Sequence, residues 1–148
     1  MLNKQNFSGL FFVFILLISF NASSGETKKD KVCFKKNCFD VELAISEEER
    51  VKGLQNRDGM PEMHGMLFIF SQERKYNFWM KDTKFPLDMI WLDSNRNVVF
   101  LQENVPPCLS NPCPTYPPSA AAMYVLELNA GLVRKLGIHL GDRAEFKL

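Results

Sequence analysis

Two carboxyl groups lie inside apolar segments of this chain, where an unpaired charge is costly. Asp88 is found in the run PLDMI, and Glu127 is found in the run VLELN. Arg57 and Lys81 are cations that could pair with them. A carboxyl group beside a cation is suited to acid–base chemistry, as in a hydrolase or lyase. The alternative is an internal ion pair of Arg57, Asp88 and Glu127 that only fixes the fold, and we favour this alternative.

Nucleophilic catalysis finds little support in the sequence. There is no Gly-x-Ser-x-Gly motif, and His64 and His139 are the two histidines that could serve as a base. We therefore predict a binding or accessory protein, and keep the enzyme built on a carboxyl group and a cation as the alternative.

A second group of residues is suited to ligand binding. Trp79 and Tyr116 supply flat aromatic faces, and Lys81, Thr83 and Asp88 supply polar groups. Such a combination can hold a small molecule, a sugar or a segment of an exported protein. The segment FWMKDTKFPLD is expected to turn between two strands, which would bring Lys81, Thr83 and Asp88 to one end of the sheet.

The segment MPEMHGM contains Met60, Met63, His64 and Met66. Thioethers together with an imidazole are ligands that copper(I) accepts. The simpler interpretation is packing, since Met66 begins an apolar strand and methionine fills irregular gaps in a core. We predict no cofactor, with copper(I) as the alternative.

The four cysteines form two pairs with the same spacing, Cys33 with Cys38 and Cys108 with Cys113. An even number of cysteines at short spacing favours disulfides in an oxidising compartment. A zinc site is the alternative. We expect each pair to close locally.

The amino-terminal segment indicates export. Residues 7–20 are almost continuously apolar, Lys4 precedes them, and small polar residues follow. This layout is typical of a signal peptide, and the run is shorter than the roughly 18–20 residues of a membrane-spanning helix. We predict cleavage after residue 24 and a secreted or periplasmic protein without a stable membrane span; an uncleaved anchor is the alternative.

The net charge of the exported part argues against nucleic acid as a partner. Removal of residues 1–24 takes away Lys4 as the one charged side chain, leaving 17 basic and 17 acidic residues. A neutral domain creates no field that attracts nucleic acid or an acidic membrane surface. The remaining length suits one domain.

The hydrophobic pattern predicts a mainly β protein. A lead with a disulfide hairpin is expected over residues 25–38, followed by a single β domain over 39–148. The capping box that starts at Ser46 predicts a helix ending at Gly53, and Asn129 is expected to cap a second helix ending at Gly137. Strands are expected at 39–45, 66–70, 76–81, 89–92, 98–102, 124–128 and 144–148.

These elements favour an antiparallel β-sandwich or barrel with two short helices. Residues 104–119 hold six prolines and two cysteines, so they form neither a helix nor a central strand. This proline-rich loop is expected to serve as a lid or as a strap over the sheet. Of Trp79 and Trp91, we expect one in the core and one partly exposed.

Ordered motifs along the chain resemble the domain of unknown function 192 family. They are Gly53-Leu54, Arg57, Gly65-Met66-Leu67-Phe68, Phe70, Phe78-Trp79-Met80-Lys81, Thr83, Pro86-Leu87-Asp88, Leu126-Glu127-Leu128, Ala130-Gly131 and Gly141-Asp142. The resemblance covers residues 39–148 and implies a compact, mainly β domain that is often exported, without an established reaction. Gln55 and Asp82 depart from the usual pattern, which has Met and Asn there.

Overall fold

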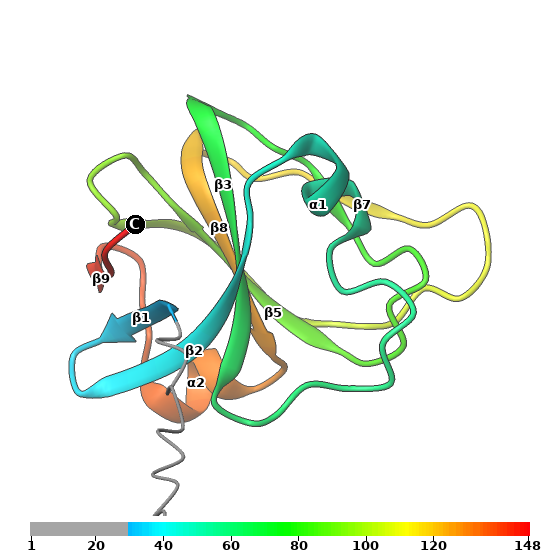
Figure 1. Cartoon of the computed structure of the whole chain (residues 1–148), viewed down its shortest axis with the longest axis horizontal. Coiled ribbons are helices and arrows are strands. Elements are labelled where there is room, and N and C mark those ends of the chain that lie inside the picture. The colour runs from blue at the N-terminus through cyan, green and yellow to red at the C-terminus, as the bar shows by residue number, and fades with distance from the viewer. Residues whose placement is uncertain (1–29) are drawn as a thin grey trace, which may run out of the picture.

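The computed structural model describes residues 30–148, so the expected signal peptide (1–24) lies outside the described residues. Two short helices and nine strands follow one another in this range (Figure 1). In chain order they are β1 (Asp30–Phe34), β2 (Asn37–Ala44), α1 (Glu47–Lys52), β3 (His64–Arg74), β4 (Phe78–Trp79), β5 (Leu87–Leu92), β6 (Val98–Val105), β7 (Thr115–Tyr116), β8 (Ala122–Asn129), α2 (Leu132–Leu136) and β9 (Ala144–Glu145). The expectation of a mainly β fold with two short helices is confirmed.

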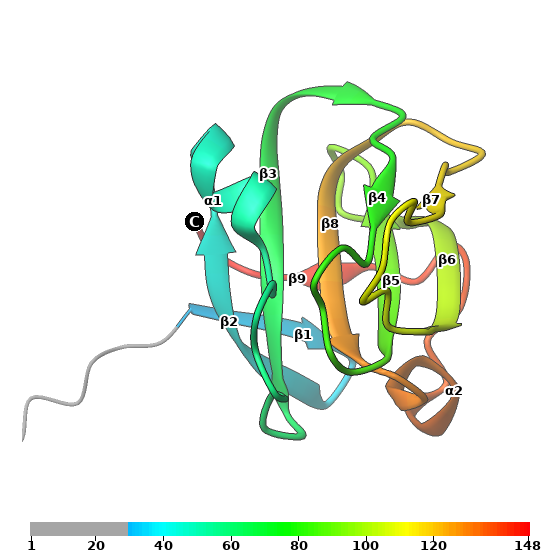
Figure 2. The same ribbon diagram turned by 90° about the vertical axis from the view of Figure 1, so that its right-hand side faces the viewer.

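Seven strands form one strongly curled sheet in the order β6-β5-β8-β3-β2-β1-β9, and β4 pairs with β7 in a separate ribbon (Figures 1 and 2). Among the described residues, the strand pairs are antiparallel except β2 with β3, which run parallel. A parallel pair needs a crossover connection rather than a hairpin. The segment that contains α1 supplies this crossover, and it carries the chain over one face of the sheet.

The two faces of the sheet have different cores. Leu67, Ile90 and Leu126 belong to one hydrophobic cluster, which also includes residues of α2. Phe68 and Met89 belong to a second cluster, together with residues after α1 and near β4. Because neighbouring residues of a strand point to opposite faces, each strand of the sheet centre contributes to both clusters.

Local signals are reproduced closely. Both expected disulfides form, Cys33–Cys38 with an S–S distance of 2.06 Å and Cys108–Cys113 with 2.11 Å. The first disulfide joins residues that face each other across the β1–β2 hairpin. The expected final strand is shorter than its pattern indicated, because pairing is limited to Ala144 and Glu145.

Candidate functional site

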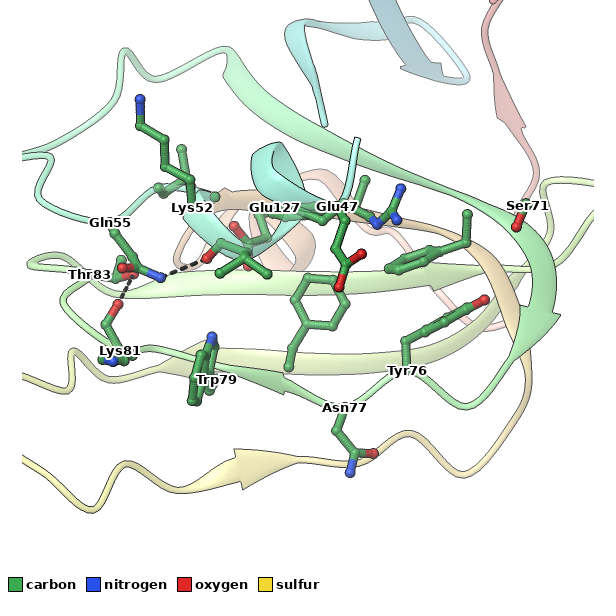
Figure 3. A pocket seen from close by; sticks show the side chains of 17 residues that line it. Glu47, Lys52, Gln55, Ser71, Tyr76, Asn77, Trp79, Lys81, Thr83 and Glu127 are labelled. Carbon is green, nitrogen blue, oxygen red and sulfur yellow. Dashed lines mark hydrogen bonds between the residues drawn. The ribbon is translucent and has the colours of Figure 1, made fainter. Parts of the chain in front are cut away.

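A cavity of about 430 Å³ lies between α1, β3, β8 and the segment 76–83 (Figure 3). Its lining joins residues that are far apart in the sequence, from Glu47 in α1 to Glu127 in β8. Nine of the seventeen lining residues belong to the motifs on which the family resemblance rests. The cavity is therefore the first place to look for a function.

The roof of the cavity is α1, which is stabilised by local contacts. The Ser46 hydroxyl accepts a hydrogen bond from the Glu49 amide at 3.1 Å, and the Glu49 carboxylate accepts one from the Ser46 amide at 2.8 Å. These two bonds form the expected capping box. Backbone hydrogen bonds from Ser46 and Ile45 also hold the pKa of Glu49 below its usual range. No residue of α1 is buried, although Glu47, Arg50 and Val51 line the cavity.

One end of the cavity is aromatic. Phe70 stacks on Tyr76 with ring centres 3.6 Å apart, and Phe68 meets Phe78 edge to face at 4.9 Å. The guanidinium of Arg50 lies 5.1 Å from the centre of the Phe70 ring. This end offers flat apolar surfaces to the body of a ligand.

The other end of the cavity is polar. Gln55 donates a hydrogen bond from Nε2 to the Val51 carbonyl at 2.7 Å, and the Thr83 hydroxyl lies 3.5 Å from the Lys81 carbonyl. The Lys81 ammonium lies 5.5 Å from the centre of the Trp79 ring. Trp79 is 45% exposed whereas Trp91 is fully buried, so the expectation of one core and one partly exposed tryptophan is confirmed.

Glu127 forms the polar part of the cavity floor. On β8 it lies directly between Met66 of β3 and Met89 of β5, and it is 4% exposed. Among residues 30–148 its carboxyl group has neither a hydrogen-bond partner nor an ion-pair partner. Burial raises its pKa to about 8. At neutral pH the floor therefore presents a protonated carboxyl group, which can both donate and accept a hydrogen bond.

Asp88 lies on the opposite face of the sheet, which corrects the predicted ion pair. In the register of β5 and β8, Asp88 faces Leu128 while Met89 faces Glu127, so the two carboxyl groups point in opposite directions. The fully buried Asp88 accepts hydrogen bonds from the Asn104 amide at 2.8 Å and the Val133 amide at 2.9 Å. The predicted ion pair of Asp88 is wrong, and Asp88 does not line the cavity.

The contact from Asp88 also corrects the expected start of α2. The helix has Gly131 as its N-cap residue and receives no hydrogen bond from an N-cap side chain. Asp88 satisfies the Val133 amide in its place. Asn129, which was expected to cap this helix, instead donates to the carbonyls of Met60 and Pro61 at 3.1 and 2.9 Å.

Arg57 is not part of the cavity or of a buried pair. Its guanidinium binds the two carboxylate oxygens of Glu42 at 2.5 and 2.8 Å on the surface. This contact raises the pKa of Arg57 and lowers that of Glu42. The predicted ion pair of Arg57, Asp88 and Glu127 is therefore wrong, because none of the three side chains pairs with another of them.

The proline-rich loop supports the wall of the cavity. Lys81 forms an isolated bridge with Cys108, and the Asp82 amide donates to the Cys108 carbonyl at 3.0 Å. Tyr116 pairs with Phe78 in the β4–β7 ribbon but does not line the cavity. Of the predicted binding residues, the structure thus brings together Trp79, Lys81 and Thr83, and leaves out Asp88 and Tyr116.

The methionine-rich segment is divided between core and surface. Met66 belongs to the buried cluster and Met60 packs against it, whereas Met63 is 37% exposed. His64 lies 4.0 Å from Asp40, a weak ion-pair distance. Within residues 30–148, no cluster of three or more His, Cys, Asp or Glu side chains is suited to a metal. Copper(I) binding by the methionine-rich segment stays a prediction.

The sequence analysis did not identify most of the residues that form the aromatic end and the roof of the cavity. Phe68 and Phe70 occupy alternate positions in β3 and therefore share a face, which is a signal present in the sequence. Gln55 was noted as a departure from the family pattern and proves to line the cavity. The contribution of Glu47 and Arg50 could not be recognised, because their exposed positions in α1 indicate only a surface helix.

Comparison with known sequences gives relatives without an assigned activity. A UPF0127 protein of Thermococcus gammatolerans is 32% identical over 108 residues, which is 69% of this chain and 63% of the relative. A UPF0127 protein of Pyrococcus abyssi is 31% identical over 111 residues, which is 72% of this chain and 85% of the relative. The matched region thus covers less than two thirds of the Thermococcus relative.

Solved structures share the fold and a substantial part of the sequence. A Sinorhizobium meliloti protein, described as a candidate transcription regulator, superposes with a TM-score of 0.73 at 36% identity, covering 80% of this chain and 94% of that one. A protein of unknown function from Novosphingobium aromaticivorans superposes with a TM-score of 0.71 at 32% identity, covering 79% of this chain and 83% of that one. A family model of uncharacterised proteins matches residues 30–146. The chain therefore belongs to the domain of unknown function 192 family.

Proposed function

We propose that this domain is a small-molecule binding module whose ligand occupies the cavity floored by Glu127. The observation that supports this most directly is the buried Glu127 carboxyl group, which faces the cavity and has no partner among the described residues. Buried polar groups in native proteins are nearly always hydrogen-bonded. The Glu127 oxygens are open to the cavity, so a ligand there would hydrogen-bond to them directly.

The size and composition of the cavity agree with this function. About 430 Å³ lies within the range of roughly 300–1,000 Å³ that is usual for small-molecule sites. Such sites combine apolar and aromatic surfaces with a few polar groups that orient the ligand. Here Phe68, Phe70 and Phe78 provide the surfaces, and Glu127 and Thr83 provide polar groups.

An acid–base enzyme is the second candidate, favoured by the raised pKa of Glu127. A carboxyl group that titrates near pH 8 is suited to exchange a proton with a substrate. Lys81 and Thr83 line the same cavity, so this enzyme would use them instead of Asp88 and Arg57. Binding is the better-supported function, because no described side chain is hydrogen-bonded to Glu127 as a catalytic partner would be.

The binding function can be tested through Trp79. It is one of only two tryptophans, and the other, Trp91, is buried in the core. We expect phenyl compounds that enter the cavity to change the emission of Trp79 in a saturable way and to raise the melting temperature. Phenylacetate, phenylacetamide and phenethylamine are suitable probes, because they share one apolar body.

The control for this titration is the Trp79→Phe variant, in which Trp91 alone emits and no ligand-dependent change is expected. A fully buried Trp91 has no contact with a compound in the cavity. If none of the three probes alters either the Trp79 emission or the melting temperature at millimolar concentration, the proposed function is wrong.

We further propose that the domain works after export from the cytoplasm. The apolar run of residues 7–20 and the two disulfides support this proposal. Among residues 30–148 there is no helix of the length and apolarity that crossing a membrane requires.

The export proposal predicts a shortened amino terminus. Protein recovered from the expressing cells is expected to begin near Gly25, because small residues precede this position as a cleavage site requires. Amino-terminal sequencing or intact-mass measurement gives the answer. A mature protein that still carries Met1 contradicts cleavage.

A further inference from the structure

We infer that the ligand is a carboxylate with an apolar body, and that its carboxylate group lies at the end of the cavity formed by Glu127, Thr83 and Lys81. This inference rests on the proposed binding function. It adds the chemical class of the ligand and the direction in which the ligand lies.

The polar and aromatic groups are separated along the cavity. Figure 3 shows Gln55, Thr83, Lys81 and Glu127 toward one end and Tyr76 at the other, with the side chain of Lys52 directed away from the cavity. Tyr76 stacks on Phe70, which extends the aromatic surface at its end. A ligand that matches both ends must have a polar group and an apolar body.

The charges around the cavity favour an anionic polar group. Arg50, Lys52 and Lys81 line the cavity, against the one carboxylate of Glu47. Arg50 lies over Phe70 at the aromatic end, which leaves Lys81 as the cation directed to the polar end. Among the described residues, neither Lys52 nor Lys81 has a carboxylate oxygen within 4.0 Å. Cations that line a cavity in this way raise the local concentration of anions and oppose the entry of ammonium compounds.

The polar end also offers hydrogen-bond donors. A protonated Glu127 can donate its O–H, and Lys81 can donate from its ammonium group. The Thr83 hydroxyl proton is directed to the Lys81 carbonyl, so Thr83 offers an acceptor oxygen there. Gln55 uses one N–H for the Val51 carbonyl and has a second available. A carboxylate accepts about four hydrogen bonds, and such bonds are stronger than those between neutral groups.

Other polar groups match this end less well. An ammonium group would bring a further positive charge beside Lys81. A primary amide could pair with the Glu127 carboxyl group, but it carries no charge to complement Lys81. The arrangement therefore favours the carboxylate over both.

Binding of a carboxylate must weaken when Glu127 ionises. The titratable groups that face the cavity are Glu47, Arg50 and Lys52 from α1, and Tyr76 and Lys81 from the segment 76–83. The strands on either side of Glu127 contribute Met66 and Met89, which do not titrate. Above a pKa of about 8, the ionised Glu127 would no longer donate and would repel the ligand carboxylate.

The test compares three probes with one phenyl body: phenylacetate, phenylacetamide and phenethylamine. At about pH 6.5 we expect phenylacetate to bind at least about tenfold more tightly than either of the others. Lys81→Gln is expected to lower the affinity for phenylacetate by about tenfold and the affinity for phenylacetamide by much less. Lys84→Gln is the matched control, because Lys84 pairs with Asp58 and does not line the cavity.

The Glu127→Gln variant isolates the role of this carboxyl group. Its amide can donate N–H at any pH, so phenylacetate affinity is expected to stay the same from about pH 6.5 to about pH 9, whereas wild-type affinity falls by about tenfold. If both proteins show the same decline, Glu127 is not the donor and the inference is wrong.

The outcomes separate the two proposals. If phenylacetamide or phenethylamine binds as tightly as phenylacetate, or if Lys81→Gln does not discriminate between phenylacetate and phenylacetamide, the carboxylate class is overturned while the binding function stands. If no phenyl probe binds, the binding function itself fails. Melting curves of each variant confirm that the protein compared is folded.

Discussion

The Glu127→Gln variant is expected to be more stable than the wild-type protein at pH 8 and equally stable near pH 4.5. In the folded protein, burial holds the proton on Glu127 up to a pKa of about 8, whereas the unfolded chain releases it near the ordinary value of 4.5. The stability that the protonated carboxyl contributes is therefore complete below pH 4.5 and is lost as the pH rises toward 8. Each pH unit between them costs about 1.4 kcal/mol.

The difference in free energy of unfolding between the two proteins therefore grows to about 3–5 kcal/mol at pH 7–8. This is a large part of the stability of a small domain. Glutamine keeps the shape and hydrogen-bonding capacity of the protonated side chain but does not ionise. Urea unfolding of both proteins at about one-unit pH intervals measures the effect.

Glu145→Gln is the matched control, because Glu145 is an exposed residue of β9 outside the cavity. It should follow the wild-type pH profile. If Glu127→Gln gives a profile parallel to that of the wild type, Glu127 is not held protonated in the folded protein.

Asp88→Asn is expected to lower the free energy of unfolding by about 2–3 kcal/mol at neutral pH. The buried Asp88 carboxylate accepts two backbone hydrogen bonds, one from Asn104 and one from Val133. An asparagine at this position has one acceptor oxygen, and its amide nitrogen would face a backbone N–H group. A buried donor left without an acceptor costs about 1–3 kcal/mol, and more where the lost partner was charged.

The same substitution should leave phenylacetate affinity unchanged wherever the variant is folded, because Asp88 lies on the face of the sheet away from the cavity. Asp58→Asn is a control, since the side chain of Asp58 is 91% exposed. A variant with unaltered stability and lost binding would return Asp88 to the ligand site and contradict the structure.

These two carboxyl groups also show how far the sequence could predict this protein. Signals within a few residues were interpreted correctly: the capping box at Ser46, the two disulfides, and the end of α2 at Gly137, where the Ile138 amide bonds to the Val133 carbonyl. Each depends on neighbours along the chain, so no knowledge of strand pairing is needed.

The face of the sheet on which a side chain lies depends on register between distant segments. Placing Glu127 in the cavity and Asp88 behind it requires the pairing of β5 with β8, in which Met89 faces Glu127. A shift of one residue would exchange the two faces. The parallel pairing of β2 with β3 is likewise a result of the tertiary fold. Trp79, Lys81 and Thr83 were found because they lie close together in one short segment.

The few contacts that hold α1 in place affect the rates at which a ligand enters and leaves the cavity. This helix buries no residue and is attached through its own cap and through Arg50, which donates to the carbonyls of Ile45 and Ile69. A local opening of this turn breaks few contacts, so its amide protons should exchange with deuterium much earlier than those of β8, whose exchange requires global unfolding. A compound could thus enter and leave during brief excursions of α1, with a residence time independent of the stability of the sheet.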